Sequence, residues 1–201
     1  MKSKLLIFAF LGILLTGIGF PSETLSGRNP DQELLKLLLS AFLGNNDLQN
    51  AFDVAKKGVE SYPNDPYWWE WYGKIASWLG RTEEAIKANL KLIELSPARE
   101  KILETFKLAV SVNRYDLAAN LIVRHPWLVD RLKAEEIYFI FVNAGRIEEF
   151  IRLAEEVYKR RKKNEYIYYM ALAQFRYGRY KQAREYIERL EAIRPLKLEE
   201  V

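Results

Sequence analysis

The chain has 201 residues, of which 49% are hydrophobic and 29% are charged. This composition supports a folded domain with a sizeable core and excludes an intrinsically disordered protein. The formal net charge of +4 is too close to neutral to indicate a polyanionic partner by itself. The absence of cysteine excludes disulfides, thiolate nucleophiles, thiolate metal ligands and lipid attachment through cysteine.

The N-terminal segment, residues 1–19, is predicted to be a secretory signal peptide. Lys2 and Lys4 form a short basic start, and residues 5–20 are an uncharged apolar run of sixteen residues. Gly17 and Gly19 suit cleavage after Gly19. The run is shorter than the ~20 residues of a membrane-spanning helix, and an uncleaved N-terminal anchor is the alternative. Both alternatives predict a periplasmic or secreted body, which disfavours nucleic acid as a partner and allows membrane contact only through an uncleaved segment.

A change of character follows the leader. Residues 20–31, with Ser22, Ser26 and Gly27, have no apolar periodicity and are predicted to be a flexible linker. From residue 32 to residue 197, helix-forming residues dominate, and apolar residues recur three and four positions apart. No segment alternates convincingly between apolar and polar residues, so the predicted fold class is all-α.

Internal repetition is the most informative feature of this region. Trp69, Gly73, Gly80, Ala85 and Pro97 have the spacing of a 34-residue helical hairpin. The residue near the start of the second helix recurs at steps of 34, 33, 32 and 33, as Ala51, Ala85, Ala118, Phe150 and Ala183. The sequence therefore predicts five hairpins, over residues 32–65, 66–98, 99–130, 131–163 and 164–197.

Each recurring residue has a mechanical role. A glycine just past a helix can take the left-handed conformation that ends it, and a proline after the second helix prevents its continuation. Gly73 and Ala85 allow two helix backbones to approach, while Trp69, Phe42 and Phe141 are predicted to fill the space beside the small residues. With these residues the sequence resembles the tetratricopeptide repeat (TPR) family over residues 32–197. The resemblance implies an α-solenoid of about five antiparallel helical hairpins, wound as a right-handed superhelix.

Two hairpins depart from the pattern. In the third, Val112 and Asn113 replace the glycine of the turn, and the second helix is predicted to stop early at His125 and Pro126, which predicts a bend in the solenoid. In the fourth, Phe150 occupies a position that is usually small, and we expect its ring to push the two helices apart.

The TPR resemblance also implies a binding groove lined by the first helix of each hairpin. The clamp with which related chaperone cofactors hold a peptide carboxylate is not reproduced at the corresponding positions. The groove is instead predicted to be aromatic with a few charges. Its predicted residues are Tyr67, Glu70, Lys74 and Trp78 in the second hairpin, Phe139 in the fourth, and Tyr168, Phe175 and Arg176 in the fifth.

The densest run of charge consists of Lys159, Arg160, Arg161, Lys162 and Lys163. One interpretation is structural, because cations at the C-terminal end of a helix interact favourably with its dipole. The other interpretation is a basic patch for an acidic protein, an anionic polysaccharide or lipid headgroups.

The sequence contains few residues that could act in catalysis or bind a metal. His125 is the single histidine, so a multi-histidine metal site and a cysteine–histidine pair are excluded. Acidic pairs such as Glu148 and Glu149 stand among lysines and arginines and suit helix-terminus charges better than acid–base catalysis. We therefore predict no catalytic residues, no cofactor and no metal, and hence a protein that is not an enzyme.

A narrower resemblance concerns the second hairpin. Residues 69–81, with Ala85 and Leu92, are similar to the periplasmic TPR part of Pel-type exopolysaccharide export proteins, although this chain lacks the outer-membrane β-barrel of those proteins. The predicted function is an exported TPR scaffold that binds a protein partner in the bacterial envelope, within an exopolysaccharide export assembly if this kinship holds. The alternative is direct carbohydrate binding through the groove aromatics.

Overall fold

The computed structural model describes residues 30–193, so the predicted signal peptide, residues 1–19, lies outside the described residues. Most of the predicted linker, residues 20–31, also lies outside them, and its last two residues belong to a helix that begins at Pro30. The described residues form ten α-helices and one short 3-10 helix, and none of them lies in a β-strand. The elements are α2 (Pro30–Gly44), α3 (Leu48–Ser61), α4 (Pro66–Trp78), α5 (Thr82–Leu95), α6 (Arg99–Ser111), α7 (Tyr115–Arg124), η1 (Pro126–Asp130), α8 (Ala134–Asn143), α9 (Ile147–Arg161), α10 (Glu165–Arg176) and α11 (Tyr180–Ile193).

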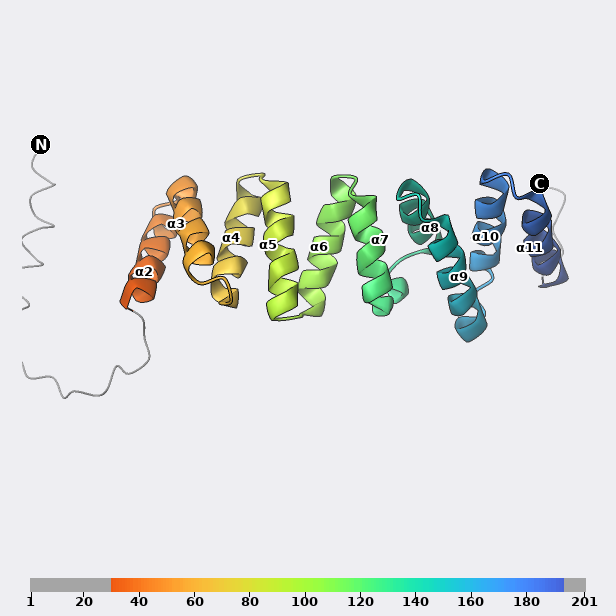
Figure 1. The fold of residues 1–201 in the computed structure, drawn as a ribbon, viewed down its shortest axis with the longest axis horizontal. Helices are drawn as coiled ribbons and strands as arrows, with labels where there is room; N and C mark the ends of the chain where they lie inside the picture. The colour runs from red at the N-terminus through yellow and green to blue at the C-terminus, as the bar shows by residue number, and fades with distance from the viewer. Residues whose placement is uncertain (1–29, 194–201) are drawn as a thin grey trace, which may run out of the picture.

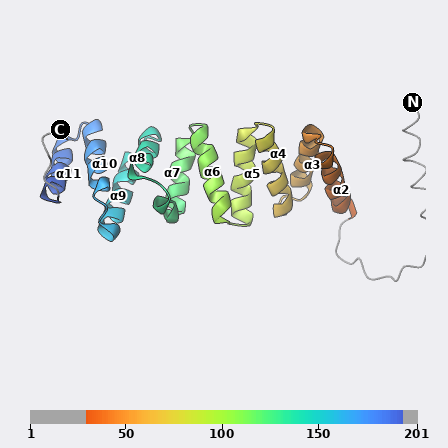
Figure 2. The ribbon, with the colours of Figure 1, turned by 180° about the vertical axis from the view of Figure 1, so that it is seen from behind.

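The helices pair in chain order as five antiparallel hairpins, from α2 with α3 to α10 with α11, which confirms the predicted TPR-like α-solenoid. Figure 1 shows the hairpins side by side in an elongated row with α2 at one end and α11 at the other, and the reverse view in Figure 2 agrees. Each second helix also packs against the first helix of the next hairpin. The core therefore runs along the row from one hairpin to the next. Between residues 30 and 193, no helix is both long and apolar enough to cross a membrane.

Every hairpin turn contains one residue with a left-handed backbone, as the repeated turn signature predicts. The residue that follows it donates its N–H to a carbonyl near the end of the first helix, as Arg81 does to Ala76 at 2.8 Å. This bond satisfies a carbonyl group that a helix end otherwise leaves unpaired. The left-handed residues are Asn46, Gly80, Asn113, Gly145 and Gly178, with φ angles of 55°, 70°, 59°, 69° and 71°.

Two glycines mark the closest approaches of neighbouring helices. A Cβ atom on Gly73 would lie 3.1 Å from the Cβ of Ala88 and 3.0 Å from the Oδ1 of Asn89, so α4 and α5 are in direct contact there. A Cβ atom on Gly58 would lie 2.0 Å from the Cε3 of Trp68, because the indole ring rests on the α3 backbone. The approach at Gly73 lies within the second hairpin, and the approach at Gly58 joins the first hairpin to the second.

Trp69 packs against the core that contains Ala85 and Ala88, as predicted, but the neighbouring Trp68 has a role that the repeat pattern does not predict. Trp68 is fully buried, whereas Trp69 is half-buried and donates its Nε1–H to the carbonyl of Pro63 at 2.7 Å. The repeat pattern marks the position of Trp69 but cannot show that the ring one residue earlier meets Gly58. Phe141 is fully buried as predicted, and Phe42 is half-buried.

The third and fourth hairpins depart from the others where the sequence does. Helix α7 ends at Arg124, as predicted, and η1 follows it with Leu128 and Val129 buried in the core. In the fourth hairpin the ring of Phe150 is fully buried, and its centroid lies 6.3 Å from that of Phe141. Aromatic rings therefore fill the space between α8 and α9. At the corresponding place between α4 and α5, a glycine and alanines lie in contact.

A ladder of arginines connects the hairpins along one edge. Four of the five turns carry an arginine directly after the left-handed residue, and each arginine reaches the second helix of the preceding hairpin. Because both partners sit at exposed helix starts, each contact adds little free energy but fixes the register between neighbours. The contacts are Arg81 to Gln49 at 3.0 Å, Arg114 to Glu83 at 3.1 Å, Arg146 to the backbone oxygen of Asp116 at 3.4 Å and to Asn120 at 2.7 Å, and Arg179 to Glu148.

Candidate binding surface

We call the exposed side of α4, α6, α8 and α10 the first-helix surface. Four of the predicted groove residues present large aromatic rings there. The exposed fractions are 56% for Trp78, 50% for Phe139, 51% for Tyr168 and 60% for Phe175. Rings of this size are usually buried when they serve the core, so half-exposed rings on the first helices are candidates for contact with a partner.

The part of this surface on α4 combines charge with aromatic rings. Lys74 lies 2.9 Å from the carboxylate of Glu70, and its ammonium stands 5.3 Å from the ring centroid of Trp71. Trp71 in turn contacts Trp78 edge-on, with ring centroids 6.4 Å apart. Glu70 also lies 3.8 Å from Lys101 on α6. The structure therefore brings Glu70, Lys74 and Trp78 together in one network that includes two residues absent from the prediction.

Tyr67 lies nearer the N-terminal end of α4 and is half-buried. The ammonium of Lys36 on α2 stands 5.2 Å from its ring centroid. Desolvation by burial raises the pKa of the Tyr67 hydroxyl, and nearby Lys36 opposes this shift. Tyr67 thus joins the first and second hairpins more than it faces solvent.

A cleft of about 280 Å³ lies between α6 and α8. Its apolar lining comes from Phe106 and Val110 on α6, from Leu132 before α8, and from Phe139 and Ile140 on α8. A neighbouring hollow of about 460 Å³ shares Phe106, Val110 and Leu132 with it. A continuous apolar depression therefore separates these two first helices, and Phe139 is the predicted groove residue that it contains.

Charged side chains also line this cleft and the neighbouring hollow. Glu135 and Glu136 line it from the first turn of α8, and Glu136 accepts the backbone N–H of Lys133 at 2.7 Å. Lys107 and Arg131 line the neighbouring hollow, and neither forms an ion pair with another described residue. The cleft and the hollow thus have an apolar floor with carboxylates and cations along their edges, and Glu136 lines both of them.

The aromatic surface continues from α8 to α10. Tyr169 contacts Tyr138 and Tyr168, with ring centroids 5.3 Å and 5.0 Å apart. Burial raises the pKa of the Tyr169 hydroxyl, and the charge of Glu135 raises it further. At the other end of α10, Phe175 contacts Tyr180 of α11 edge-on at 5.4 Å, and Arg176 is exposed beside it. The rings of Tyr168 and Phe175 therefore rest on other rings and keep one side accessible.

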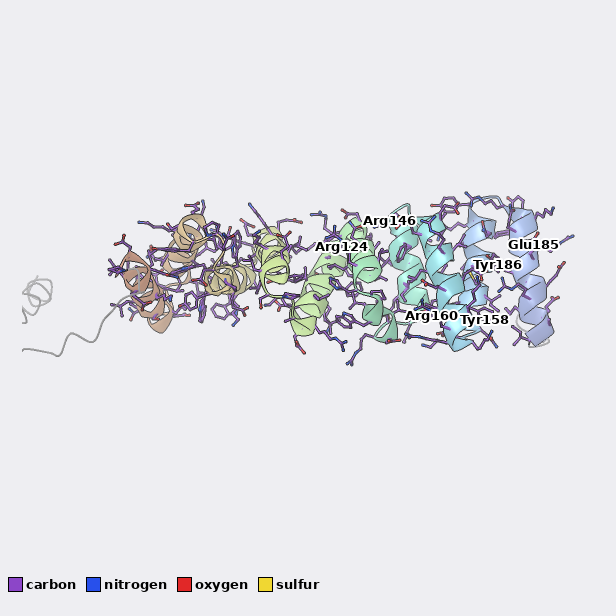
Figure 3. The ribbon with its side chains drawn as sticks, turned by 60° about the horizontal axis from the view of Figure 1, so that its bottom comes forward. Arg124, Arg146, Tyr158, Arg160, Glu185 and Tyr186 are labelled. Carbon is purple, nitrogen blue, oxygen red and sulfur yellow. The ribbon has the colours of Figure 1, made fainter. Side chains whose placement is uncertain are left out.

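The predicted basic patch, Lys159 to Lys163, lies in the last turn of α9 and the two residues after it, and all five side chains are exposed. Figure 3 shows Arg160 and Tyr158 near this end of α9, with Arg146 near the other end. Arg160 donates to Glu156 at 2.8 Å, and Arg161 donates to Asp130 at 3.1 Å. Two of the five cations are therefore neutralised locally, and the helix-end position agrees with the structural interpretation.

His125 lies at the end of α7, where it was expected. Burial and the neighbouring charge of Arg124 lower the pKa of its imidazole. Among residues 30–193, no group of three or more histidine, cysteine, aspartate or glutamate side chains is placed to hold a metal ion. Many of the described carboxylates are engaged in ion pairs, such as those of Glu70, Glu83 and Glu149.

The cleft between α6 and α8 is the feature that sequence reasoning missed. Lys107, Val110 and Ser111 follow Lys74, Ser77 and Trp78 by 33 residues, so the repeat register alone places them on the first-helix surface. Phe106 and Leu132 cannot be found in this way. Their contribution depends on η1, which interrupts the repeat between α7 and α8.

Comparison with known proteins supports the repeat architecture. Residues 164–197 match the family described as the Fis1 C-terminal tetratricopeptide repeat. The comparison with curated protein sequences gives no significant match. The single matched repeat and the five hairpins together support the TPR family for this chain, while nothing in these matches bears on Pel-type proteins.

Several solved structures are similar to the chain at low sequence identity. The Naa15/Naa10 complex bound to HypK-THB is 14% identical with a TM-score of 0.63, covering 78% of this chain and 25% of that one. MamA from Desulfovibrio magneticus RS-1 is 15% identical with a TM-score of 0.43, covering 82% and 96% of the two chains. YrrB, a TPR protein with an unusual peptide-binding site, is 14% identical with a TM-score of 0.43, covering 78% and 83%. The likeness to Naa15/Naa10 shows a shared fold, so function has to be argued from the surface itself.

Proposed function

We propose that this protein is an exported scaffold that binds a protein partner on its first-helix surface, with the cleft between α6 and α8 as the principal anchor site. The observation that carries this proposal is the apolar depression beside the half-exposed ring of Phe139. Protein interfaces gain most of their free energy from a few large side chains that enter such pockets. The rings of Trp78, Tyr168 and Phe175 extend the same surface along the solenoid.

The lining of the cleft indicates what it would bind. Its floor is apolar, and a volume of about 280 Å³ suits one or two bulky side chains of a partner. Lys107 and Arg131 in the neighbouring hollow favour a carboxylate near that anchor, and Glu135 in the cleft favours a cation. A partner segment with a large apolar residue and charges of both signs near it therefore fits best.

The proposed place of this scaffold is the bacterial envelope. The basic and apolar N-terminal segment supports export, and the similarity of residues 69–81 to Pel-type proteins suggests an exopolysaccharide export assembly. Fusion of the first 29 residues to alkaline phosphatase tests the export step, because this enzyme is active only outside the cytoplasm. N-terminal sequencing of the whole protein separates cleavage after Gly19 from an uncleaved anchor.

Site-specific photocrosslinking tests the binding surface. A photoreactive amino acid at Phe139 or Tyr168 should give a discrete adduct in the producing cells, and the same residue at Lys57 on α3 should not. The additional change Val110→Asp should abolish the adduct from position 139, because a carboxylate would enter the apolar cleft. Equal adducts from positions 139 and 57 would show that the first-helix surface is not the binding site.

Direct sugar binding is the second candidate, and the accessible rings of Tyr168 and Phe175 favour it. Aromatic faces stack on the apolar faces of sugar rings, and no catalytic carboxylate is needed for binding. Affinity electrophoresis through gels that contain the producer's exopolysaccharide separates the two candidates. Retardation that Tyr168→Ala abolishes, together with no protein adduct from position 139, would replace the protein-scaffold function with this one.

A further inference from the structure

The two ends of the solenoid expose positions that are buried in every internal hairpin. The eighth residue of each second helix is the clearest case, because the next hairpin covers it. Ile187 occupies this position in α11 and is 41% exposed. Its internal counterparts Ala55, Asn89, Ile122 and Ala154 are each at most 1% exposed.

The first helix shows the complementary pattern. Tyr72 of α4 is buried, and its ring contacts Phe52 of the preceding hairpin with centroids 4.9 Å apart. The equivalent position in α2, 34 residues earlier, is Leu38, which is 38% exposed. Leu34, equivalent to the fully buried Trp68, is 55% exposed. A preceding hairpin would cover these leucines, and the described chain has none.

The end residues are complementary in size. Inside the chain, the large ring of Trp68 rests on Gly58, the eleventh residue of α3. At the ends, the corresponding residues are Leu34 on α2 and Leu190 on α11, so two medium side chains replace a large and a small one. The total volume available at such a junction is similar, and volume-conserving exchanges of this kind are well tolerated in packed interfaces.

The end residues also carry opposite charges. At an end junction, however, the cation lies on the earlier hairpin, whereas inside the chain the arginine lies on the later one. At each internal junction an arginine at the start of one second helix meets the second residue of the previous second helix. The partner is the carboxylate of Glu83 or Glu148 at two junctions, the amide of Gln49 at a third and the backbone oxygen of Asp116 at the fourth. In the last hairpin this second residue is Lys181, and in the first hairpin the arginine position is Asp47. A junction between α11 and α2 would therefore pair Lys181 with Asp47. Lys181 is exposed and has no hydrogen bond or ion pair with another described residue.

We propose that a second copy of this chain occupies each end, with α11 of one copy packed against α2 of the next as if it were the following hairpin. The two faces lie at opposite ends of the row in Figure 1, so one copy cannot join its own ends. Unlike surfaces that meet head to tail form open chains unless the rotation closes a ring. The first-helix surface takes no part in this contact, so the proposal is independent of the partner-binding function.

Charge reversal tests the proposed register. The whole protein, processed by the cell that makes it, should associate with increasing concentration in sedimentation velocity. Lys181→Glu should weaken association about tenfold, because it places a carboxylate opposite Asp47. Adding Asp47→Arg should restore it, because this recreates the arginine and glutamate of the internal junctions. Lys57→Glu, the same charge change on α3, is the matched control and should have no effect.

Blocking one face at a time tests the head-to-tail geometry. Leu34→Glu alone and Ile187→Glu alone should each be monomeric, because every junction needs one α2 face and one α11 face. A mixture of the two variants should give a one-to-one dimer through the remaining pair of intact faces. Val123→Glu, an equally exposed apolar position on α7, should leave association unchanged. Melting curves of Leu34→Glu, Ile187→Glu, Val123→Glu and Lys181→Glu should coincide, because these side chains are exposed in one copy. Asp47→Arg should melt lower, because the Asp47 side chain caps α3 by accepting the backbone N–H of Asn50.

Three results would overturn the proposal. A wild-type protein that stays monomeric at all concentrations would show that the ends have another occupant, such as residues 194–201 or a different protein. Association that survives both Leu34→Glu and Ile187→Glu would place the contact elsewhere. Association that only one of these variants weakens would indicate a symmetric contact between identical faces.

Discussion

The contact between Gly58 and Trp68 makes a sharp prediction about how two hairpins are joined. A Cβ atom at position 58 would lie 2.0, 2.2 and 2.7 Å from the Cε3, Cδ2 and Cζ3 atoms of Trp68. The indole ring is fully buried, so it cannot rotate into solvent to avoid the new methyl group. The ring also contacts Tyr62 and Tyr67, with centroids 6.3 Å and 5.1 Å away. Gly58→Ala must therefore push α3 and α4 apart.

Two opposing terms set the size of the effect. Overpacking of a core by added methyl groups costs about 1–3 kcal/mol, and an overlap with a rigid buried ring belongs at the upper end. Alanine in a helix interior is more favourable than glycine by roughly 0.5–1 kcal/mol. We therefore expect Gly58→Ala to lower the free energy of unfolding by about 2 kcal/mol. For a domain of this size, that corresponds to a melting temperature about 4–8 °C lower.

Urea denaturation followed by circular dichroism measures this change. Gly44→Ala is the matched control, because a Cβ atom at Gly44 has no neighbour within 4 Å, and it should leave stability equal or slightly higher. Trp68→Leu should relieve the overlap, so the double variant should lose at least ~1 kcal/mol less than the two single variants added together. If Gly58→Ala is as stable as Gly44→Ala, the ring does not rest on α3 and the reasoning is refuted.

Three further predictions follow from the packing and the exposed rings. Gly73→Leu should cost a few kcal/mol, since even a Cβ there lies 3.1 Å from the Cβ of Ala88, whereas Glu83→Gln should cost less than about 1 kcal/mol, as thermal melting would show. Tyr166 is fully buried, has no hydrogen-bond partner for its hydroxyl among the described residues, and has a pKa raised to about 12 by burial. Because the folded state favours the neutral hydroxyl, it contributes stability below pH 10 that is lost as the pH rises towards 12. Tyr166→Phe removes this titration, so its free energy of unfolding should fall less in alkaline denaturation curves. Trp78→Ala with Tyr168→Ala should weaken partner or glycan binding while shifting the melting temperature by under ~3 °C, and early unfolding would assign these rings to the core.

The helices and turns were predictable because their causes are local. A residue that tolerates the left-handed conformation ends each first helix, and it recurs from Asn46 to Gly178 with the period of the hairpin. Apolar spacing determines which side of a helix is buried, so the five hairpins and the early end of α7 could be predicted from the sequence. The exposure of Trp78, Phe139, Tyr168 and Phe175 agrees with their predicted place on the first helices, although their binding role stays a prediction.

The contacts between hairpins were not predictable from the same pattern. Trp68 and Trp69 both fit an apolar position, and the choice between them depends on Gly58, which lies in another hairpin. The arginine after four of the turns is visible in the sequence, but three of these arginines meet Gln49, Glu83 or Glu148, which lie 31 or 32 residues earlier. Such pairs become apparent only when the register between neighbouring hairpins is known.

The cleft lies where the repeat is least regular, and this coincidence has a physical basis. A regular solenoid gives each first helix equivalent neighbours. After α7 ends at Arg124, η1 and Leu132 replace the last turn of the repeat, so α6 and α8 lack this regular packing. The space between them is lined by Phe106, Val110 and Phe139, whose apolar side chains would lose contact with water if a partner filled it. Departures from a repeat lower its stability, so a departure that creates an apolar cleft is better explained by binding than by folding.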